Sequence, residues 1–280
     1  MKKQQLILAS GGLILLVLLF FFGNTVPPVS AKAQEDESQP NTSEKGAAGI
    51  IDAAKKNINS FQSEKLAQLE NSVVRGNVKE QQTGVYKQMA QYWEDSLQRP
   101  EIGAYYFGEA AKLENSEKNL NFAARLMLNM MMAGSNPDEV TWLATNAKDL
   151  YEQSLKINPA NDSIKIELGA CYLFGNISAM PMEGILKIKE VAERDTTNMY
   201  AQLMLGLGSI RSQQYDKAVE RLEKVVKYEP YNIQALFNLA ETYERKGDKV
   251  NAVKWYKLVE NHVDLPEAKR EIENRINSLK

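Results

Sequence analysis

The sequence predicts an all-α fold of about five stacked helical hairpins, and three observations support it. Residues 199–232 contain two amphipathic stretches, each with apolar residues at the spacing of one helix face, separated by a short polar turn. The same pattern returns 34 residues later, so that Leu205 aligns with Leu239 and Ala218 with Ala252. Helices this short bury too little surface to be stable alone, and repeats of this length stack on their neighbours.

The repeated unit resembles the tetratricopeptide repeat (TPR) family. That family places small residues at positions 8 and 20 of each repeat, with large residues around them, including an aromatic residue at position 11. In residues 199–232 these two positions hold Gly206 and Ala218, and in the following repeat Ala240 stands at position 8. Small residues there let the two helices of a hairpin approach closely. The resemblance implies a right-handed superhelix, an α-solenoid, that covers residues 85–266.

The chain after residue 45 divides into a helical array with a cap at each end. The predicted segments are an N-terminal helical hairpin or cap at 46–76, repeats at 85–118, 119–161, 162–198, 199–232 and 233–266, and a C-terminal capping helix at 266–280. Arrays of this kind need capping elements to cover their terminal apolar faces. The 46–76 segment has an apolar stripe in each half, so an alternative role is a hairpin for self-association or partner docking.

The first 45 residues predict a membrane anchor followed by a linker. Residues 1–5 are a short basic start containing Lys2 and Lys3, and residues 6–22 are almost unbroken apolar sequence. An apolar helix of this length nearly crosses a hydrocarbon core of about 30 Å, and the two lysines favour a cytoplasmic N-terminus. Residues 23–45 are rich in proline, polar and acidic residues, which predicts a disordered linker.

This topology makes the chain a single-pass inner-membrane protein with its TPR domain in the periplasm of a Gram-negative-type envelope. The alternative is a signal peptide cleaved after Ala33, because Ala31-Lys32-Ala33 satisfies the small-x-small cleavage rule. Cleavage would leave a soluble periplasmic protein. The apolar run is longer than that of a usual signal peptide, which favours the anchor.

Composition argues against several classes of function. A net charge of −2 gives no basic surface field for nucleic acid. One cysteine, Cys171, and one histidine, His262, exclude cysteine metal clusters and His-pair metal sites. The sequence has no phosphate loop and no nucleophilic-serine motif. We therefore expect no enzymatic activity, no cofactor and no metal; the expected partners are cell-envelope proteins and, through residues 6–22, the membrane, with a homo-oligomer as an alternative.

The resemblance also implies that the first helix of each repeat lines a concave groove. By this resemblance the groove positions are 2, 5, 9, 12 and 13 of each repeat, and in the first four repeats they hold mainly aromatic residues, aliphatic residues and methionines. The predicted partner-binding residues are Tyr86, Met89, Trp93, Met127, Met130, Met131, Ile166, Phe174, Tyr200, Leu203, Leu207 and Phe237. A large exposed apolar surface usually marks an interaction site, and methionine adapts to varied partners. The alternative is that tight curvature, or the segment at 47–75, buries these side chains within the chain.

We expect a non-enzymatic scaffold or adaptor, tethered to the inner membrane, that binds a partner protein in this groove. Such a protein resembles the TPR proteins that assist envelope assembly, secretion or cytochrome maturation. One alternative is a chaperone-like holdase for apolar segments of exported proteins, which would bind many chains weakly. Another is a structural protein that self-associates through residues 47–75.

Overall fold

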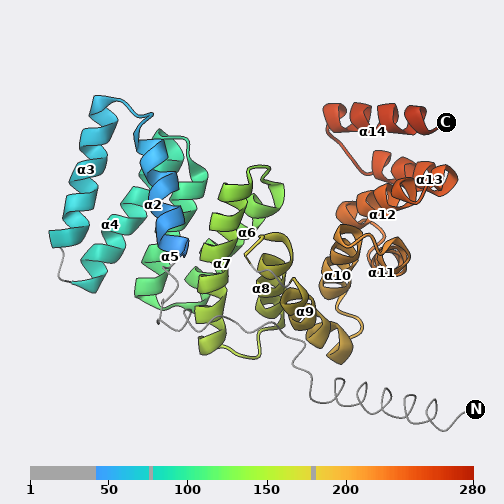
Figure 1. The fold of residues 1–280 in the computed structure, drawn as a ribbon, viewed down its shortest axis with the longest axis horizontal. Coiled ribbons are helices and arrows are strands. Elements are labelled where there is room, and N and C mark those ends of the chain that lie inside the picture. The colour runs from blue at the N-terminus through green and yellow to red at the C-terminus, as the bar shows by residue number, and fades with distance from the viewer. Residues whose placement is uncertain (1–41, 76–77, 178–180) are drawn as a thin grey trace, which may run out of the picture. The chain divides into compact units, whose positions relative to one another are not determined.

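The computed structural model describes residues 42–75, 78–177 and 181–280, and in these residues it is all-helical, as predicted (Figure 1). The described residues form thirteen α-helices and one π-helical segment, with no strand. The helices are α2 (Thr42–Lys55), α3 (Ser60–Arg75), α4 (Lys79–Gln91), η1 (Tyr92–Ser96), α5 (Pro100–Glu114), α6 (Glu117–Ala133), α7 (Pro137–Ile157), α8 (Asp162–Phe174), α9 (Met182–Arg194), α10 (Met199–Arg211), α11 (Tyr215–Tyr228), α12 (Ile233–Arg245), α13 (Lys249–Glu260) and α14 (Pro266–Leu279).

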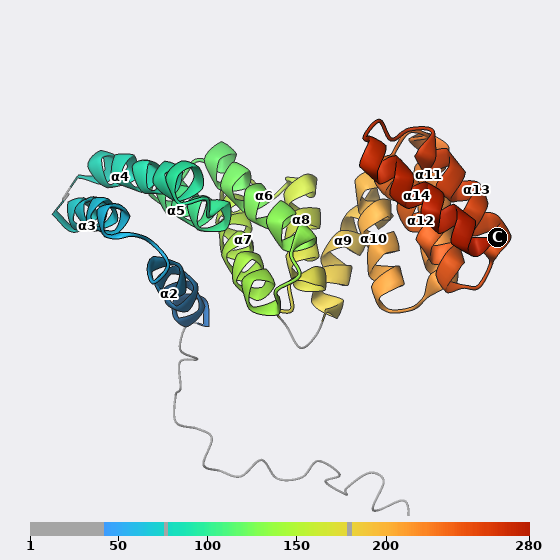
Figure 2. The same cartoon turned by 90° about the horizontal axis from the view of Figure 1, so that it is seen from above.

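These helices pair and stack as a TPR-like solenoid. Five successive pairs pack closely, namely α4 with α5, α6 with α7, α8 with α9, α10 with α11, and α12 with α13. Each pair then contacts the next, and the first helices also touch across pairs, with α8 lying against both α6 and α10 (Figures 1 and 2). Helix α14 packs on α13 and closes the series. Neighbour-only contacts of this kind define a repeat architecture.

Asparagine side chains fix where several of the helices begin. The Oδ1 atoms of Asn161, Asn198 and Asn232 accept hydrogen bonds from the backbone N–H groups of Ile164, Ala201 and Ala235. Each asparagine is the residue directly before α8, α10 or α12, and an Asn at this N-cap position satisfies one of the unpaired N–H groups of the first turn. The same sequence feature therefore starts the first helix of three successive repeats.

Small residues set the closeness of the helix pairs. A Cβ atom on Gly184 would lie 2.3 Å from the carbonyl oxygen of Gly169, so α8 and α9 touch through their backbones. A Cβ on Gly206 would lie 3.1 Å from the Leu222 side chain of α11. Ala240 on α12 and Ala252 on α13 are fully buried and belong to one apolar cluster. The structure thus places small residues at the positions where the repeat pattern required them.

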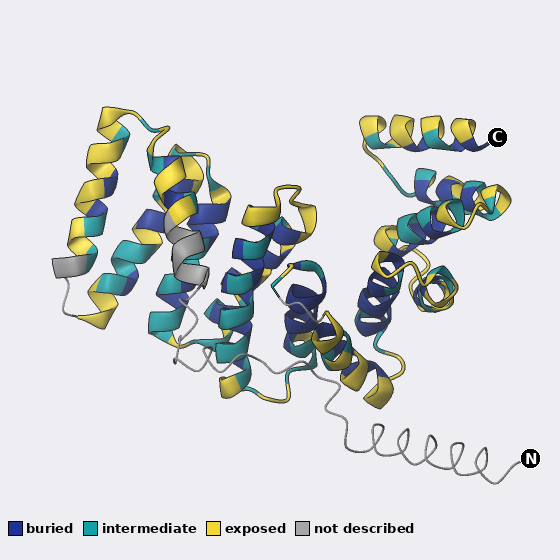
Figure 3. Ribbon diagram, in the orientation of Figure 1, coloured by how far each residue is buried: buried dark blue, intermediate teal, exposed yellow. Residues whose placement is uncertain are grey.

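The apolar core runs along the array and is divided near its C-terminal end. One cluster of buried residues extends from Ile51 to Leu239, and a second is formed by α12, α13 and α14. Helices α8 and α10 are buried on almost every face, whereas α14 is exposed on its outer side (Figure 3).

The two N-terminal helices cover part of the first cluster. Helix α2 contributes Ile51 and Ala54, helix α3 contributes Leu66 and packs on α4, and an ion pair of 2.6 Å joins Lys55 to Glu70. Helix α2 begins at Thr42, within the segment expected to be linker. The predicted membrane segment at 6–22 and most of the linker lie outside the described residues. Among the residues that are described, no helix combines the length and apolarity needed to span a membrane.

Candidate functional site: a groove along the first helices

The structure buries most of the predicted groove residues. Seven of the twelve are buried, namely Met89, Trp93, Met127, Met131, Ile166, Leu203 and Leu207. The remaining five are partly buried, namely Tyr86, Met130, Phe174, Tyr200 and Phe237. A partner that leaves the fold unchanged would contact the second group, because the first group is enclosed by the chain itself. Partner binding by the twelve residues stays a prediction.

A shift of register explains the burial in the first two repeats. Taking α6 to begin a repeat at Glu117, as α10 and α12 begin theirs, puts the small residue Ala124 at position 8 and Met127 at the packing position 11. The first repeat has the same pattern, with Ala90 followed three residues later by Trp93. This register lies two residues before that of the predicted repeats 85–118 and 119–161. The Ala-x-x-Trp and Ala-x-x-Met spacings were the sequence signal for it.

Direct packing explains the burial in the third and fourth repeats. Helix α8 contacts both α6 and α10, so Ile166 on α8 faces a neighbouring helix instead of solvent. Gly208 permits this approach, because a Cβ on it would lie 2.7 Å from the Leu173 side chain. The packing of α8 against α6 and α10 therefore buries the deepest part of the predicted groove. This agrees with the alternative of tight curvature.

An open groove remains beside these buried residues, and four successive first helices line it. This four-helix groove has a volume of about 330 Å³. Its lining residues are Leu128, Asn129, Met132 and Ala133 of α6, Ala170 of α8, Tyr200 and Met204 of α10, and Gln234 of α12. In the shifted register Leu128 and Asn129 take the groove positions 12 and 13, and Tyr200 and Gln234 take position 2. Of the twelve predicted residues, Tyr200 is the one that lines it.

Methionine and amide side chains form the accessible part of the four-helix groove. Met132 is 38% exposed, and Asn129 and Gln234 are also exposed, whereas Leu128, Ala170 and Met204 form a buried floor. A flexible thioether can adapt to different apolar side chains, and amide groups can pair with the backbone of a bound segment. This combination suits a peptide better than a fixed small molecule.

An ion pair joins α6 to α8, two of the helices that line the four-helix groove. The guanidinium of Arg125 on α6 donates two hydrogen bonds, of 2.6 and 2.9 Å, to Glu167 on α8, whose side chain is almost fully buried. Burial, together with the nearby charge of Glu167, raises the pKa of Tyr200. The phenol that lines the groove is therefore neutral and can act as a hydrogen-bond donor over the physiological pH range.

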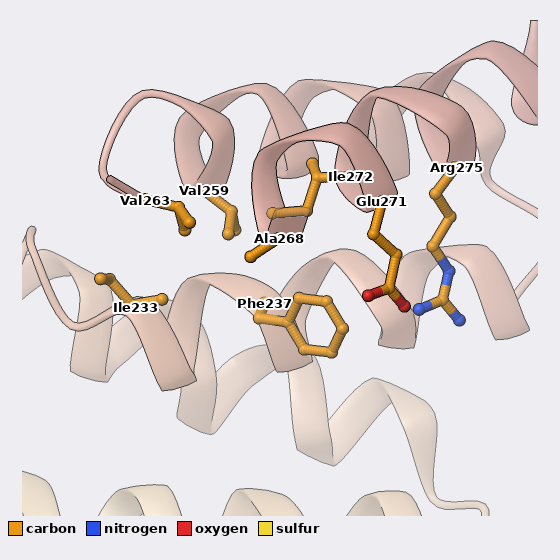
Figure 4. A pocket seen from close by; sticks show the side chains of 8 residues that line it. All are labelled: Ile233, Phe237, Val259, Val263, Ala268, Glu271, Ile272 and Arg275. Atoms are coloured by element: carbon orange, nitrogen blue, oxygen red, sulfur yellow. The ribbon is translucent and has the colours of Figure 1, made fainter. Parts of the chain in front are cut away.

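A second pocket lies between α12 and α14, and we call it the α14 pocket (Figure 4). It has a volume of about 200 Å³ and is lined by Ile233, Phe237, Val259, Val263, Ala268, Glu271, Ile272 and Arg275. Figure 4 shows Phe237 on α12 facing Ala268 and Ile272 on α14, with Glu271 and Arg275 at one end. The predicted residue Phe237 therefore lines this pocket.

Arg275 is held in place by four neighbours. Its guanidinium pairs with Glu241 at 3.1 Å and with Glu244 at 3.2 Å. It also lies over the rings of Phe237 and Tyr256, with centroid distances of 5.8 and 5.5 Å. Burial alone would lower the pKa of Arg275, but Tyr256 and the two carboxylates outweigh it and raise the pKa. The cation is permanent and already paired.

The described residues hold no group of histidine, cysteine and acidic side chains that could bind a metal ion. Cys171 is fully buried, and burial raises the pKa of its thiol. The Nδ1 atom of His262 lies 2.6 Å from the carbonyl oxygen of Leu258, within its own helix turn.

The stacked helix pairs and the groove along their first helices define an α-helical repeat protein of the protein-binding class. Residues 209–270 match the family model described as tetratricopeptide repeat, so this part of the chain carries tetratricopeptide repeats, as the resemblance implied. Proteins with these repeats bind protein partners and are generally non-enzymatic scaffolds.

One solved structure supports the fold, and others are similar to this chain in part. A tetratricopeptide repeat protein from Parabacteroides merdae matches with a TM-score of 0.52 and 13% identity, over 84% of this chain and 86% of that one. TTC0263, a TPR protein of Thermus thermophilus, gives a TM-score of 0.49 and 16% identity over 70% and 98% of the two chains. PilW, a type IV pilus biogenesis factor, gives a TM-score of 0.47 and 17% identity, over 70% of this chain and 92% of that one. No curated protein matches the sequence.

Proposed function

We propose that the protein is a membrane-tethered scaffold that binds a segment of a partner protein in the four-helix groove. The observation that carries this proposal is the groove itself, a hollow of about 330 Å³ that is lined by the first helices of four successive repeats and has accessible side chains from α6, α10 and α12. Binding a segment across several repeats is the normal use of a repeat array. Met132, Asn129 and Gln234 supply an adaptable apolar contact and two amide contacts around Tyr200.

Residues 6–22 are the proposed tether, and the partner is then a protein of the cell envelope. The array would lie on the periplasmic side of the inner membrane, because the basic start of the chain favours the cytoplasm. Cleavage after Ala33 would give the same array as a soluble periplasmic protein. Protease treatment of spheroplasts tests the location: an external protease should degrade the array without detergent, and protection of the array would contradict a periplasmic site.

Photo-crosslinking in intact cells tests the groove. Crosslinking residues placed at Met132 and Tyr200 should capture the partner, whereas one at Lys189, which is exposed on the second helix of its pair, should not. One dominant adduct at the groove positions would support an adaptor. Many different adducts would support the chaperone-like holdase, and adducts between copies of this chain would support self-association. Equal capture at Lys189 would contradict a dedicated groove.

A charge placed in the groove gives an independent test. Met132→Glu adds a carboxylate at an exposed side chain, so the fold and the helical circular-dichroism signal should be unchanged. Capture of the partner from the Tyr200 probe should fall at least tenfold, because an unpaired charge is costly against an apolar segment. Lys189→Glu serves as the matched control and should leave capture unchanged.

A further inference from the structure

The α14 pocket is too small for a typical ligand and suits one apolar side chain. Its volume of about 200 Å³ is below the roughly 300–1,000 Å³ of most small-molecule sites. Ile233, Val259, Val263 and Ala268 make most of its wall apolar. A single aliphatic or aromatic side chain of a bound segment would remove these walls from water.

Exposed apolar residues lie next to the pocket in the chain. Leu265 is 70% exposed and directly precedes α14, and Tyr231, at 76%, lies two residues before Ile233 and places its ring 5.2 Å from that of His262. Ile233 itself lines the pocket and is 41% exposed. Exposed apolar residues that are grouped in this way are typical of a contact surface.

The charged end of the pocket carries an excess of negative charge. Arg275 already pairs with Glu241 and Glu244, so its single positive charge meets two carboxylates. Glu271 lines the pocket one helical turn before Arg275, is exposed, and makes no ion pair within the described part of the chain. Glu241 and Glu244 thus already neutralise Arg275, and Glu271 is the one carboxylate that lines the pocket without an ion pair among the described residues.

We propose that the α14 pocket binds an apolar side chain that is flanked by lysine or arginine in a partner segment. The apolar side chain fills the space between Phe237 and Ala268, and the neighbouring cation pairs with Glu271. Electrostatic complementarity of this kind selects the partner more than it adds affinity. The proposal rests on the scaffold function above and adds a chemical identity for part of the bound segment.

Peptide binding to the full-length chain in phosphatidylcholine nanodiscs tests this proposal, with fluorescence anisotropy as the readout. The probes are three labelled 15-residue peptides in a Gly-Ser background, with central Lys-Leu-Lys, Glu-Leu-Glu or Lys-Ser-Lys. The Lys-Leu-Lys peptide should bind at least tenfold more tightly than either of the others. Equal binding of the Glu-Leu-Glu peptide would overturn the charge preference, and equal binding of the Lys-Ser-Lys peptide would overturn the apolar pocket.

Two variants on α14 and one on α12 locate the binding. Glu271→Gln should weaken the Lys-Leu-Lys peptide at least fivefold, while Glu273→Gln, which is exposed on the same helix but does not line the pocket, should not change it. Phe237→Ala should also weaken it. If Glu271→Gln and Glu273→Gln behave alike, the proposal fails.

Two outcomes separate this proposal from the function it rests on. Partner capture at Met132 together with no binding of any peptide would leave the scaffold function standing and remove the α14 proposal. Selective binding of the Lys-Leu-Lys peptide together with no partner capture at Met132 would support the α14 pocket and overturn the four-helix groove as the binding site.

Discussion

At the scale of single residues, close contacts decide where the chain tolerates change. Gly169 and Gly184 bring the backbones of α8 and α9 together, and no side chain fits between them. Gly84 has no such packing role, because a Cβ atom on it would meet nothing within 4 Å. Substitution by alanine should therefore separate packing glycines from tolerant ones.

Gly184→Ala should destabilise the protein by about 1–3 kcal/mol, because the added methyl group must push α8 away from α9. Gly84→Ala should be neutral or stabilising by about 0.5–1 kcal/mol, since alanine restricts the unfolded chain. Urea unfolding followed by circular dichroism measures both changes. Equal unfolding midpoints for Gly184→Ala and Gly84→Ala would contradict the close contact between Gly184 and Gly169.

The interaction of Glu114 with Lys87 makes one part of the stability depend on pH. Lys87 donates a hydrogen bond of 2.5 Å to Glu114, and Asn119 donates to the other carboxylate oxygen. The bond from Lys87, followed by that from Asn119, outweighs burial and lowers the pKa of Glu114 from 4.5. A lowered folded-state pKa stabilises the protein above the unfolded value, and this stabilisation disappears as the pH falls through the folded value.

Glu114→Gln should therefore lower the free energy of unfolding at neutral pH, and the difference from wild type should shrink as the pH falls below 4.5. Denaturant unfolding at a series of pH values measures this difference. Glu220→Gln is the control, because Glu220 is exposed and makes no ion pair in the described structure. A Glu114→Gln difference that stays constant across the acidic range would contradict the assigned pairing.

At the scale of helices, repeated caps and spacings made much of the structure predictable. The predicted starts of the last three repeats coincide with the first residues of α8, α10 and α12, because each follows an asparagine N-cap. The first two repeats departed from the expected register. The long helix α7 lengthens the hairpin of α6 and α7 beyond 34 residues, which breaks the spacing that an alignment needs.

The candidate groove was harder to predict because burial depends on the neighbouring repeat. Leu203 and Leu207 have the same side chain and the same spacing whether or not another helix covers them. Only the contact of α10 with α8 decides this, and it arises between repeats. Asn129 was missed because the register in α6 was unknown, and Met132 because it takes none of the groove positions of its repeat. Gln234 takes groove position 2 of the last repeat but was left out of the predicted apolar set because it is polar.

Asn232→Ala should destabilise the protein by about 1 kcal/mol, since it removes the acceptor for the Ala235 N–H. Asn274→Ala on α14 is the control, because Asn274 is exposed and caps no helix. Thermal unfolding of the two variants side by side measures the effect. If Asn274→Ala costs as much as Asn232→Ala, capping is not the cause.

At the scale of the whole array, the division of the core predicts stepwise unfolding. The second cluster depends on Ile272, Ile276 and Leu279 of α14, which cover Tyr256 and Val259 of α13. Because each repeat touches only its neighbours, damage at one end should stay local.

Ile276→Ala should cost about 2–5 kcal/mol within the C-terminal cluster. Amide hydrogen exchange should then accelerate in α13, while α6 and α7 keep the protection they have in the wild type. Glu273→Ala, on the exposed side of α14, should leave both regions unchanged. Uniform acceleration along the chain would show that the array unfolds as one unit.

The burial of Cys171 also makes its thiol a reporter of local opening of the array. The chain has no other thiol, and this one is enclosed in α8 between two neighbouring hairpins, with burial as the main cause of its raised pKa. An alkylating reagent can reach the sulfur only when that part of the array opens, so the labelling rate counts opening events at the centre of the chain. Binding of a partner segment in the four-helix groove should lower the labelling rate of Cys171. The buried thiol should also remain free of disulfides in an oxidising compartment.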